Sequence, residues 1–287
     1  VFKLILGWFR NVLQTVYVNE AGHLRYIIML SKLFKRVEFV IHVRLTEDVS
    51  SRPWRFLARR NLKVLATSRF IQSQLEDRGV AASVLSSPFR SKIISFRRSS
   101  LSTRKLIVVS RLSEAKGICY YERLVNYFES SKYEMEIHHF GECDYAAEKV
   151  VLRFNKLKYV RWIPHGFEPD KSFIFSAGIV LHLNPNEPLG VVLLEALNHS
   201  IPFLTFDAGG TGEISRELGA AKFLLNFQSN GWEQEALRRL LQLQPDEWLD
   251  EAEKSRKLLE SKYGPERYAF ELDRIFCKKN DEFQFTD

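Results

Sequence analysis

The sequence predicts an α/β protein made of two Rossmann-like domains, each with a parallel sheet flanked by helices. Short β-branched runs alternate with helical patterns along the whole chain, and this alternation is typical of parallel sheets covered by helices. The segment Ser91–Arg104, rich in Ser and Arg, separates two such series and is expected to be a linker. The length of 287 residues suits two domains of about 150 residues each.

The first series contains four expected strands, at Thr15–Val18, Val37–Val43, Leu62–Ala66 and Ser83–Leu85. Helical patterns cover His23–Phe34 and Phe70–Arg78. Gly79 is expected to end the second helix, because glycine readily takes the left-handed conformation of a C-terminal cap.

The second series contains six expected strands, at Lys105–Val109, Met135–Phe140, Tyr159–Trp162, Gly178–Leu183, Ile201–Phe206 and Lys222–Leu225. Helices are expected at about Tyr120–Phe128, Gly190–Asn198 and Trp232–Gln242. The stretch Pro245–Cys277 is helical with a break near Tyr263-Gly264-Pro265, since proline cannot continue a helix. Ligands of such sheets bind beyond the carboxyl ends of the strands, so we expect a site between the two domains.

The composition excludes several classes of protein. Apolar residues make up 45% and charged residues 27%, which is ordinary for a globular protein and excludes a disordered tail or a collagen-like fibre. No run of about 18 apolar residues is long enough to span a bilayer. The three cysteines are widely spaced and give neither a disulfide framework nor a zinc site, so a reducing, cytoplasmic location is expected.

Charge is distributed unevenly along the chain. Residues 1–105 hold 20 basic and 6 acidic residues, a net charge of +14, whereas residues 106–287 hold 22 and 29, a net charge of −7. The basic half predicts attraction to an anionic surface. A mixture of cations and aromatic residues suited to a membrane interface is formed by Arg52, Arg55, Arg59, Arg60 and Lys63 around Trp54 and Phe56. The same mixture suits RNA, but no RNA-binding signature is present, so no nucleic-acid partner is predicted. A solvated surface with a chance bias is the simpler alternative.

The first candidate site segment follows the strand Lys105–Val109. Arg111 and Lys116 lie in the loop after this strand, just before a helix. Two cations at the carboxyl edge of a sheet and close to a helix N-terminus favour binding of a diphosphate. A solvated loop is an equally good interpretation of this segment taken alone.

The second candidate segment runs from Asn184 to Ala196. A tight turn holds Glu187, Leu189 and Gly190, and a helix beginning at Val191 carries Glu195, eight residues after Glu187. Glycine lets the backbone approach a ligand closely at a helix start that has unpaired amides. Carboxylates accept hydrogen bonds from vicinal hydroxyls, so one can bind a sugar and the other a ribose. Alternatively, Glu195 lies on a solvated helix face.

The remaining motifs mainly exclude other classes of binding site. Residues 207–213, Asp-Ala-Gly-Gly-Thr-Gly-Glu, lack the third glycine of a dinucleotide fingerprint and are expected to be a tight loop. No P-loop and no strict Asp-x-Asp is present, so protein cations rather than a metal ion are expected to neutralise a diphosphate. His42, at the end of the run from Val37, is the one histidine singled out; a structural histidine is the alternative.

The ordered set of these motifs resembles the retaining, nucleotide-sugar-dependent glycosyltransferases of family four, which have the GT-B architecture. The resemblance rests on Glu187-Pro-Leu-Gly190 with Glu195 (an E-x7-E element), Arg111 with Lys116-Gly117, His42, the Gly209-Gly-Thr-Gly-Glu213 pattern and the loop Trp162-Ile-Pro-His-Gly166. It extends from about Val16 to Phe276. The family's opening strand and glycine-rich loop have no counterpart, so the first domain is expected to be incomplete.

The resemblance implies a role for each residue. Arg111 and Lys116 would bind the donor diphosphate and stabilise the leaving group, and Glu187 and His42 would contact the transferred hexose. Glu195 would hold the donor ribose, and the backbone at Leu189, Gly190 and Val191 and the Gly166 loop would complete the donor site. No covalent nucleophile, metal or other cofactor is implied.

The resemblance also implies the organisation and the partners. Residues 1–104 would form the acceptor-side domain, 105–262 the nucleotide-sugar domain and 263–287 a helix that returns to the first domain. The acceptor would be a saccharide or lipid-linked hydroxyl in the synthesis of a cell-surface glycan, polysaccharide or glycolipid, at the cytoplasmic face of a membrane. The alternative is a non-catalytic glycosyltransferase-like subunit that docks a partner at the membrane.

Overall fold

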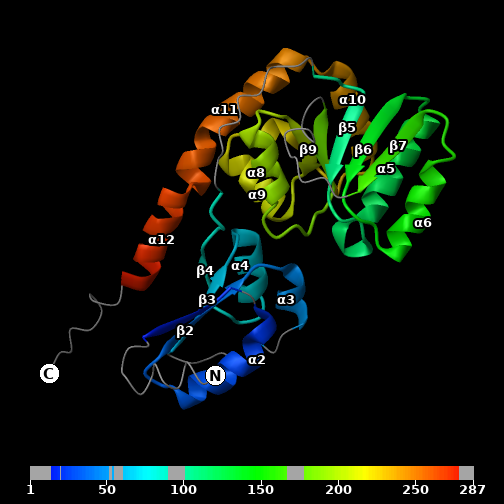
Figure 1. The fold of residues 1–287 in the computed structure, drawn as a ribbon. Helices are drawn as coiled ribbons and strands as arrows, with labels where there is room; N and C mark the ends of the chain where they lie inside the picture. The colour runs from blue at the N-terminus through cyan, green and yellow to red at the C-terminus, as the bar shows by residue number, and fades with distance from the viewer. Residues whose placement is uncertain are drawn as a thin grey trace. The chain divides into compact units, whose positions relative to one another are not determined.

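The computed structural model describes residues 14–19, 21–51, 54, 61–89, 101–166 and 178–277. The chain divides into two compact units, and each has a parallel sheet with helices packed against it (Figure 1). The α/β class with two parallel sheets is therefore confirmed. The first unit holds Val1–Pro88 and Glu266–Asp287, and the second holds Phe89–Pro265. Most of the expected linker Ser91–Arg104 lies outside the described residues.

The first unit contains a four-stranded sheet in the order β1-β2-β3-β4. Its strands are β1 (Thr15–Val18), β2 (Glu38–Val43), β3 (Leu62–Ala66) and β4 (Ser83–Val84), and its helices are η1 (Ala21–His23), α2 (Leu24–Leu33), α3 (Thr46–Ser51), α4 (Arg69–Glu76) and α12 (Pro265–Cys277). All six residues of β2 are buried, as expected for a parallel strand covered on both faces. Gly79, with φ of +74°, ends the turn after α4 as predicted.

Side chains that alternate along β2 and β3 supply two separate cores. Phe39, Ile41 and Val64 pack with residues of α2 and α4 on one face of the sheet. Val40 and Leu65 point to the other face, where Leu272 and other apolar residues of α12 cover them. The C-terminal helix thus forms part of the first unit, because the far face of this sheet has an apolar strip that needs a cover.

The second unit contains a six-stranded sheet in the order β10-β9-β8-β5-β6-β7. The strands are β5 (Lys105–Val109), β6 (Met135–Phe140), β7 (Val160–Gly166), β8 (Ile179–His182), β9 (Phe203–Phe206) and β10 (Leu224–Leu225). The helices are η3 (Glu114–Lys116), α5 (Ile118–Ser130), α6 (Tyr145–Phe154), α8 (Val191–Asn198), α9 (Gly209–Glu217), η4 (Ala221–Phe223), α10 (Trp232–Gln242) and α11 (Pro245–Tyr263). This is the doubly wound strand order of dinucleotide-binding domains.

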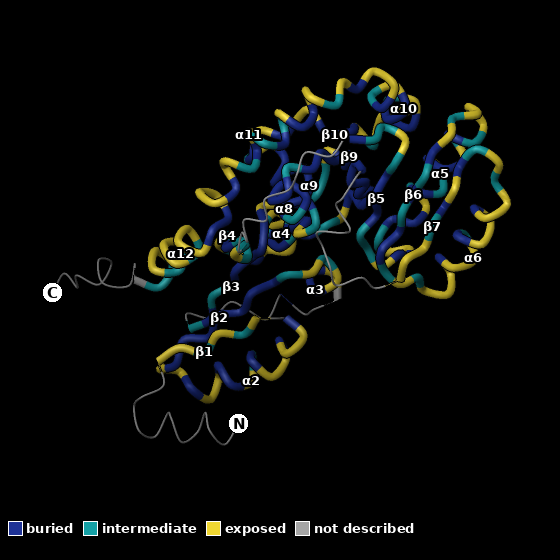
Figure 2. The backbone as a smooth tube through the Cα atoms, turned by 45° about the horizontal axis from the view of Figure 1, so that its top comes forward, coloured by how far each residue is buried: buried dark blue, intermediate teal, exposed yellow. Residues whose placement is uncertain are grey.

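Helices cover both faces of this larger sheet. α5 contacts α6 and α10, and α8 contacts α11. All residues of β8 and β9 are buried, and Figure 2 shows the helices around the sheet alternating between buried and exposed residues. α11 ends at Tyr263 and α12 begins at Pro265, so the predicted break is confirmed. Within the described part of the chain, no helix is long and apolar enough to span a bilayer.

Candidate functional site

The strand order of the second unit brings two of the predicted segments together. From β5 the chain winds outward through β6 and β7, then crosses back to β8 on the other side of β5. In doubly wound sheets, ligands bind at the carboxyl ends of the strands where the order reverses. Arg111 and Lys116 follow β5, and Glu187 and Gly190 follow β8. Residues more than 70 positions apart in sequence therefore meet at this switch point.

An ion pair joins the two segments. The Lys116 Nζ lies 3.0 Å from the Glu187 Oε2, and the exposed fractions of the two side chains are 28% and 15%. The Asn184 Nδ2 donates a second hydrogen bond of 3.0 Å to the same oxygen. Glu187 Oε1 has no hydrogen-bond partner within the described segments. The protein thus fixes one oxygen of this carboxylate, and the described residues make no hydrogen bond to the other.

The buried His182 completes the surroundings of Glu187. Its Nε2 lies 3.5 Å from the Glu187 Oε2 and makes no closer hydrogen bond to the residues that the structure describes. Burial acts to raise the pKa of Glu187, but the adjacent His182 imidazole and the ion pair with Lys116 outweigh it and lower this pKa to about 2. Glu187 is therefore a carboxylate at every physiological pH.

Glycine and tyrosine residues hold the Lys116 loop against β8. Ser113 Oγ accepts a hydrogen bond of 3.2 Å from the Lys116 N–H, and the next residue, Gly117, has φ of +78°. A Cβ on Gly117 would overlap the carbonyl oxygen of Leu183, just after β8. The buried Tyr121 hydroxyl of α5 accepts a hydrogen bond of 3.0 Å from the Leu183 N–H. Backbone contact, rather than long side chains, sets the position of Lys116.

The Glu187 turn is fixed from its other side by α9. Residues 207–213 were expected to be a loop, but α9 begins at Gly209. A Cβ on Gly210 would overlap the backbone carbonyl of Pro188, and the Gly210 N–H donates a hydrogen bond of 2.7 Å to the Glu187 carbonyl. Gly209 and Gly210 therefore allow the start of α9 to pack directly on the Glu187 turn. The glycine-rich sequence by itself does not indicate this packing.

Gly190 links this turn to the next helix. It has φ of +86° and forms the N-cap of α8, and an added Cβ would lie 2.6 Å from the Thr211 Cγ2. Leu189 is buried, whereas Val191 is 43% exposed. Glu195 is half-buried, one helical turn after Val191 on the same face of α8. The two glutamates of the E-x7-E spacing therefore lie on a turn and on the helix that follows it.

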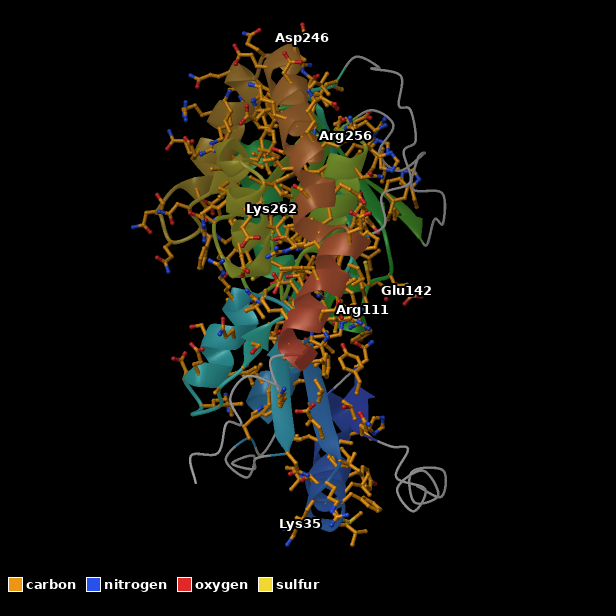
Figure 3. All side chains as sticks on the ribbon, turned by 90° about the vertical axis from the view of Figure 1, so that its left-hand side faces the viewer. Lys35, Arg111, Glu142, Asp246, Arg256 and Lys262 are labelled. Carbon is orange, nitrogen blue, oxygen red and sulfur yellow. The ribbon has the colours of Figure 1, made fainter. Side chains whose placement is uncertain are left out.

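Arg111 and Gly166 lie at the same carboxyl edge of the sheet, after β5 and at the end of β7. The Arg111 side chain is exposed and has no ion-pair partner in the described ranges. Figure 3 labels it beside Glu142, in agreement with the hydrogen bond of 2.8 Å from the Leu112 N–H to the Glu142 carbonyl. Gly166, with φ of +69°, ends β7, two strands from β5.

His42 belongs to the first unit, where it is buried. Its Nδ1 lies 2.6 Å from the Tyr17 hydroxyl, and only 1% of the residue is exposed. Burial, and after it the Arg44 guanidinium, lowers the pKa of His42 to about 4. The imidazole is therefore neutral at physiological pH, and its contact with a donor sugar stays a prediction.

Three features went unrecognised in the sequence. His182 and Asn184 contact Glu187, but the sequence motifs did not assign His182 to the site. Its position at the carboxyl end of a strand is the feature that could have indicated it. Asp144, considered as half of an acidic pair, caps α6 by accepting a hydrogen bond of 2.8 Å from the Ala147 N–H. Among the residues that the structure describes, no group of three or more His, Cys, Asp or Glu side chains could hold a metal ion.

Comparisons with known proteins identify the fold. No family model matches the chain, and no curated protein matches it in sequence. Among solved structures, Anabaena Alr3699/HepE in complex with UDP and glucose superposes with a TM-score of 0.73 at 16% identity, covering 96% of this chain and 81% of HepE.

Two further structures agree with this result. TarM of S. aureus in complex with UDP gives a TM-score of 0.71 at 14% identity, covering 91% of this chain and 55% of TarM. Sucrose-phosphate synthase from Thermosynechococcus elongatus gives 0.70 at 14% identity, covering 92% of this chain and 73% of that one. The chain therefore has the two-sheet α/β fold of these proteins, the GT-B fold.

Proposed function

We propose that this protein is a retaining glycosyltransferase that moves a hexose from a nucleoside diphosphate donor to an acceptor hydroxyl. The observation that carries the proposal is the ion pair of 3.0 Å between Lys116 and Glu187 at the switch point of the second sheet. The fold supports it, because HepE is described with UDP and glucose and TarM with UDP. UDP is therefore the first nucleotide to test.

The diphosphate would bind beside Lys116. The backbone of this lysine is already held in place by the Ser113 hydroxyl and by the close contact of Gly117 with Leu183, so little backbone ordering is needed when the ligand arrives. The exposed Arg111 begins the same loop and would supply a second positive charge. Fixed cations stabilise the negative charge that develops on a leaving diphosphate, and losing one such group costs about 10²–10³ in rate in other enzymes.

The sugar would be held by Glu187 and the ribose by Glu195. Glu187 Oε2 is occupied by Lys116 and Asn184, so Oε1 would accept a hydrogen bond from a sugar hydroxyl. The amides at the start of α8, next to the left-handed Gly190, would bind the sugar or the phosphate, since the first N–H groups of a helix lack partners within it. Glu195, one turn along α8, would accept hydrogen bonds from the ribose hydroxyls.

Retention, the absence of a metal requirement and the acceptor complete the proposal. No protein nucleophile is assigned, so the acceptor would attack from the same face as the departing diphosphate, which would take the acceptor's proton. Lys116 and Arg111 would neutralise the diphosphate without a metal ion. The acceptor would be a saccharide or a lipid-linked hydroxyl in glycan, polysaccharide or glycolipid synthesis on the inner face of a membrane.

Calorimetric titration of UDP, GDP and ADP into the full chain tests this proposal. One nucleotide should bind, and Lys116→Ala and Glu195→Gln should each weaken that binding at least tenfold, whereas the control Lys254→Ala, which breaks an exposed pair on α11, should not. Donor hydrolysis or transfer by the same variants then measures the rate. Undiminished binding and activity in folded Lys116→Ala and Glu195→Gln would refute the site. Absence of heat with every nucleotide would instead favour a non-catalytic subunit.

A further inference from the structure

The basic segment that the sequence suggested as a membrane contact does not present its aromatic residue. Trp54 is only 3% exposed, and its Nε1 donates hydrogen bonds to the carbonyls of Asp48 and Val49. Arg55, Arg59 and Arg60 lie outside the described residues. The tryptophan is a core residue of the first unit and is not available for a membrane contact.

The outer face of α2 carries large exposed apolar side chains. Tyr26, Met29 and Leu33 are 66%, 58% and 67% exposed. At 3.6 residues per turn, they fall within about 60° of one another and form a stripe about 10 Å long. The opposite side of α2 packs on the sheet through Leu24, Ile27 and other residues, and Figure 2 shows exposed and buried segments alternating along this helix. The stripe is therefore not needed for the core.

Positive charge accompanies the stripe. Arg25 and Lys32 lie along the side of it that faces away from the core, and Lys35 and Arg36 follow in the turn after α2, where Figure 3 labels Lys35. All four residues are exposed. Residues 21–37 contain no Asp or Glu, and the next acid, Glu38, is buried and paired with Lys63 at 3.2 Å. No carboxylate within this stretch offsets the four cations.

We propose that this α2 outer face, formed by Tyr26, Met29 and Leu33 with Arg25 and Lys32, docks on the headgroup region of an anionic lipid bilayer. Apolar side chains beside cations on one helix face are the combination that an anionic bilayer surface binds. A second copy of the chain fits less well, because a two-fold interface on α2 would bring the same cations face to face. The inference extends the proposed function, in which the acceptor lies at the inner face of a membrane, and vesicle binding tests it separately from sugar transfer.

Co-sedimentation of the full chain with two kinds of vesicle tests the proposal. The protein should bind vesicles of mixed phosphatidylcholine and phosphatidylglycerol, and binding to phosphatidylcholine alone should be much weaker. Arg25→Gln with Lys32→Gln should weaken binding about 25-fold, at about fivefold for each cation. Met29→Ser with Leu33→Ser should weaken it at least tenfold.

A matched control comes from the second unit. Leu241 on α10 is 62% exposed and Lys156 is exposed, so Leu241→Ser with Lys156→Gln should bind vesicles like the unaltered chain. Circular dichroism melting curves verify that each variant is folded. The proposal is overturned if the chain ignores phosphatidylglycerol or if folded α2 variants bind like the control. It is also overturned if the chain is a dimer that Leu33→Asp dissociates, because a second copy would then occupy the face.

Discussion

Replacing Lys116 by methionine should destabilise the second unit and raise the pKa of Glu187. Interactions that outweigh burial lower this pKa from 4.5 to about 2, which corresponds to about 3 kcal/mol in favour of the carboxylate. His182 and Lys116 share this stabilisation, so losing the lysine should cost about 1–2 kcal/mol. The cost stays below that of a fully buried ion pair, because Asn184 keeps its hydrogen bond to Glu187.

The sign of the pH dependence follows from the lowered pKa. Glu187 binds a proton more weakly in the folded chain than in the unfolded chain. Its contribution to the free energy of unfolding is therefore fully present above pH 4.5 and is lost as the pH falls from about 4.5 to about 2. In Lys116→Met the pKa moves back toward 4.5, so less stability is lost over this range.

A double-mutant cycle measures the pair itself. The free energy of unfolding of the full chain is obtained from urea denaturation at pH 7 for Lys116→Met, Glu187→Gln and the combined variant. We expect a coupling energy of about 1–2 kcal/mol. The matched control is Lys254→Met with Glu251→Gln, an exposed pair separated by 3.7 Å, which should give less than about 0.5 kcal/mol. A coupling energy below about 0.3 kcal/mol between Lys116 and Glu187 would refute the reasoning.

Three further outcomes are expected. Gly117→Ala should destabilise the chain by several kcal/mol and weaken nucleotide binding, because the new Cβ would overlap the Leu183 carbonyl. The control Gly219→Ala has a similar φ of +71° and no atom within 4 Å of the new Cβ, so it should cost only about 1–2 kcal/mol. Equal losses of stability in thermal melts of the two variants would contradict this reasoning. His42, with a pKa of about 4, resists protonation in the fold, so stability should fall by about 3 kcal/mol as the pH drops from about 6.5 to about 4, and His42→Gln should flatten that slope; an unchanged slope would show that another group is responsible. Chelation by EDTA should leave the rate of sugar transfer unchanged, and a rate restored only by Mg²⁺ or Mn²⁺ would show that Lys116 and Arg111 do not suffice.

Local sequence was enough to predict the alternating architecture and most strands. Lys105–Val109, Met135–Phe140 and Leu62–Ala66 have the predicted bounds, since short segments of apolar and β-branched residues favour strands. The prediction of α9 as a loop was wrong for a local reason: two glycines at a helix start signal a turn by propensity. The close contact of Gly210 with the Pro188 backbone, which tolerates no Cβ, explains instead why glycine stands at this helix start.

By itself, the sequence determined the fold class and identified Lys116 and Glu187 as candidate site residues. Both inferences depend on hydrophobic periodicity and residue type, which are properties of neighbouring positions in the chain. Only the tertiary structure decided that these two side chains pair, that His182 and Asn184 join them, and that Trp54 is buried while Tyr26, Met29 and Leu33 are exposed. Strand order sets which loops become neighbours, and packing sets which apolar residues are left outside. Both depend on contacts between distant parts of the chain.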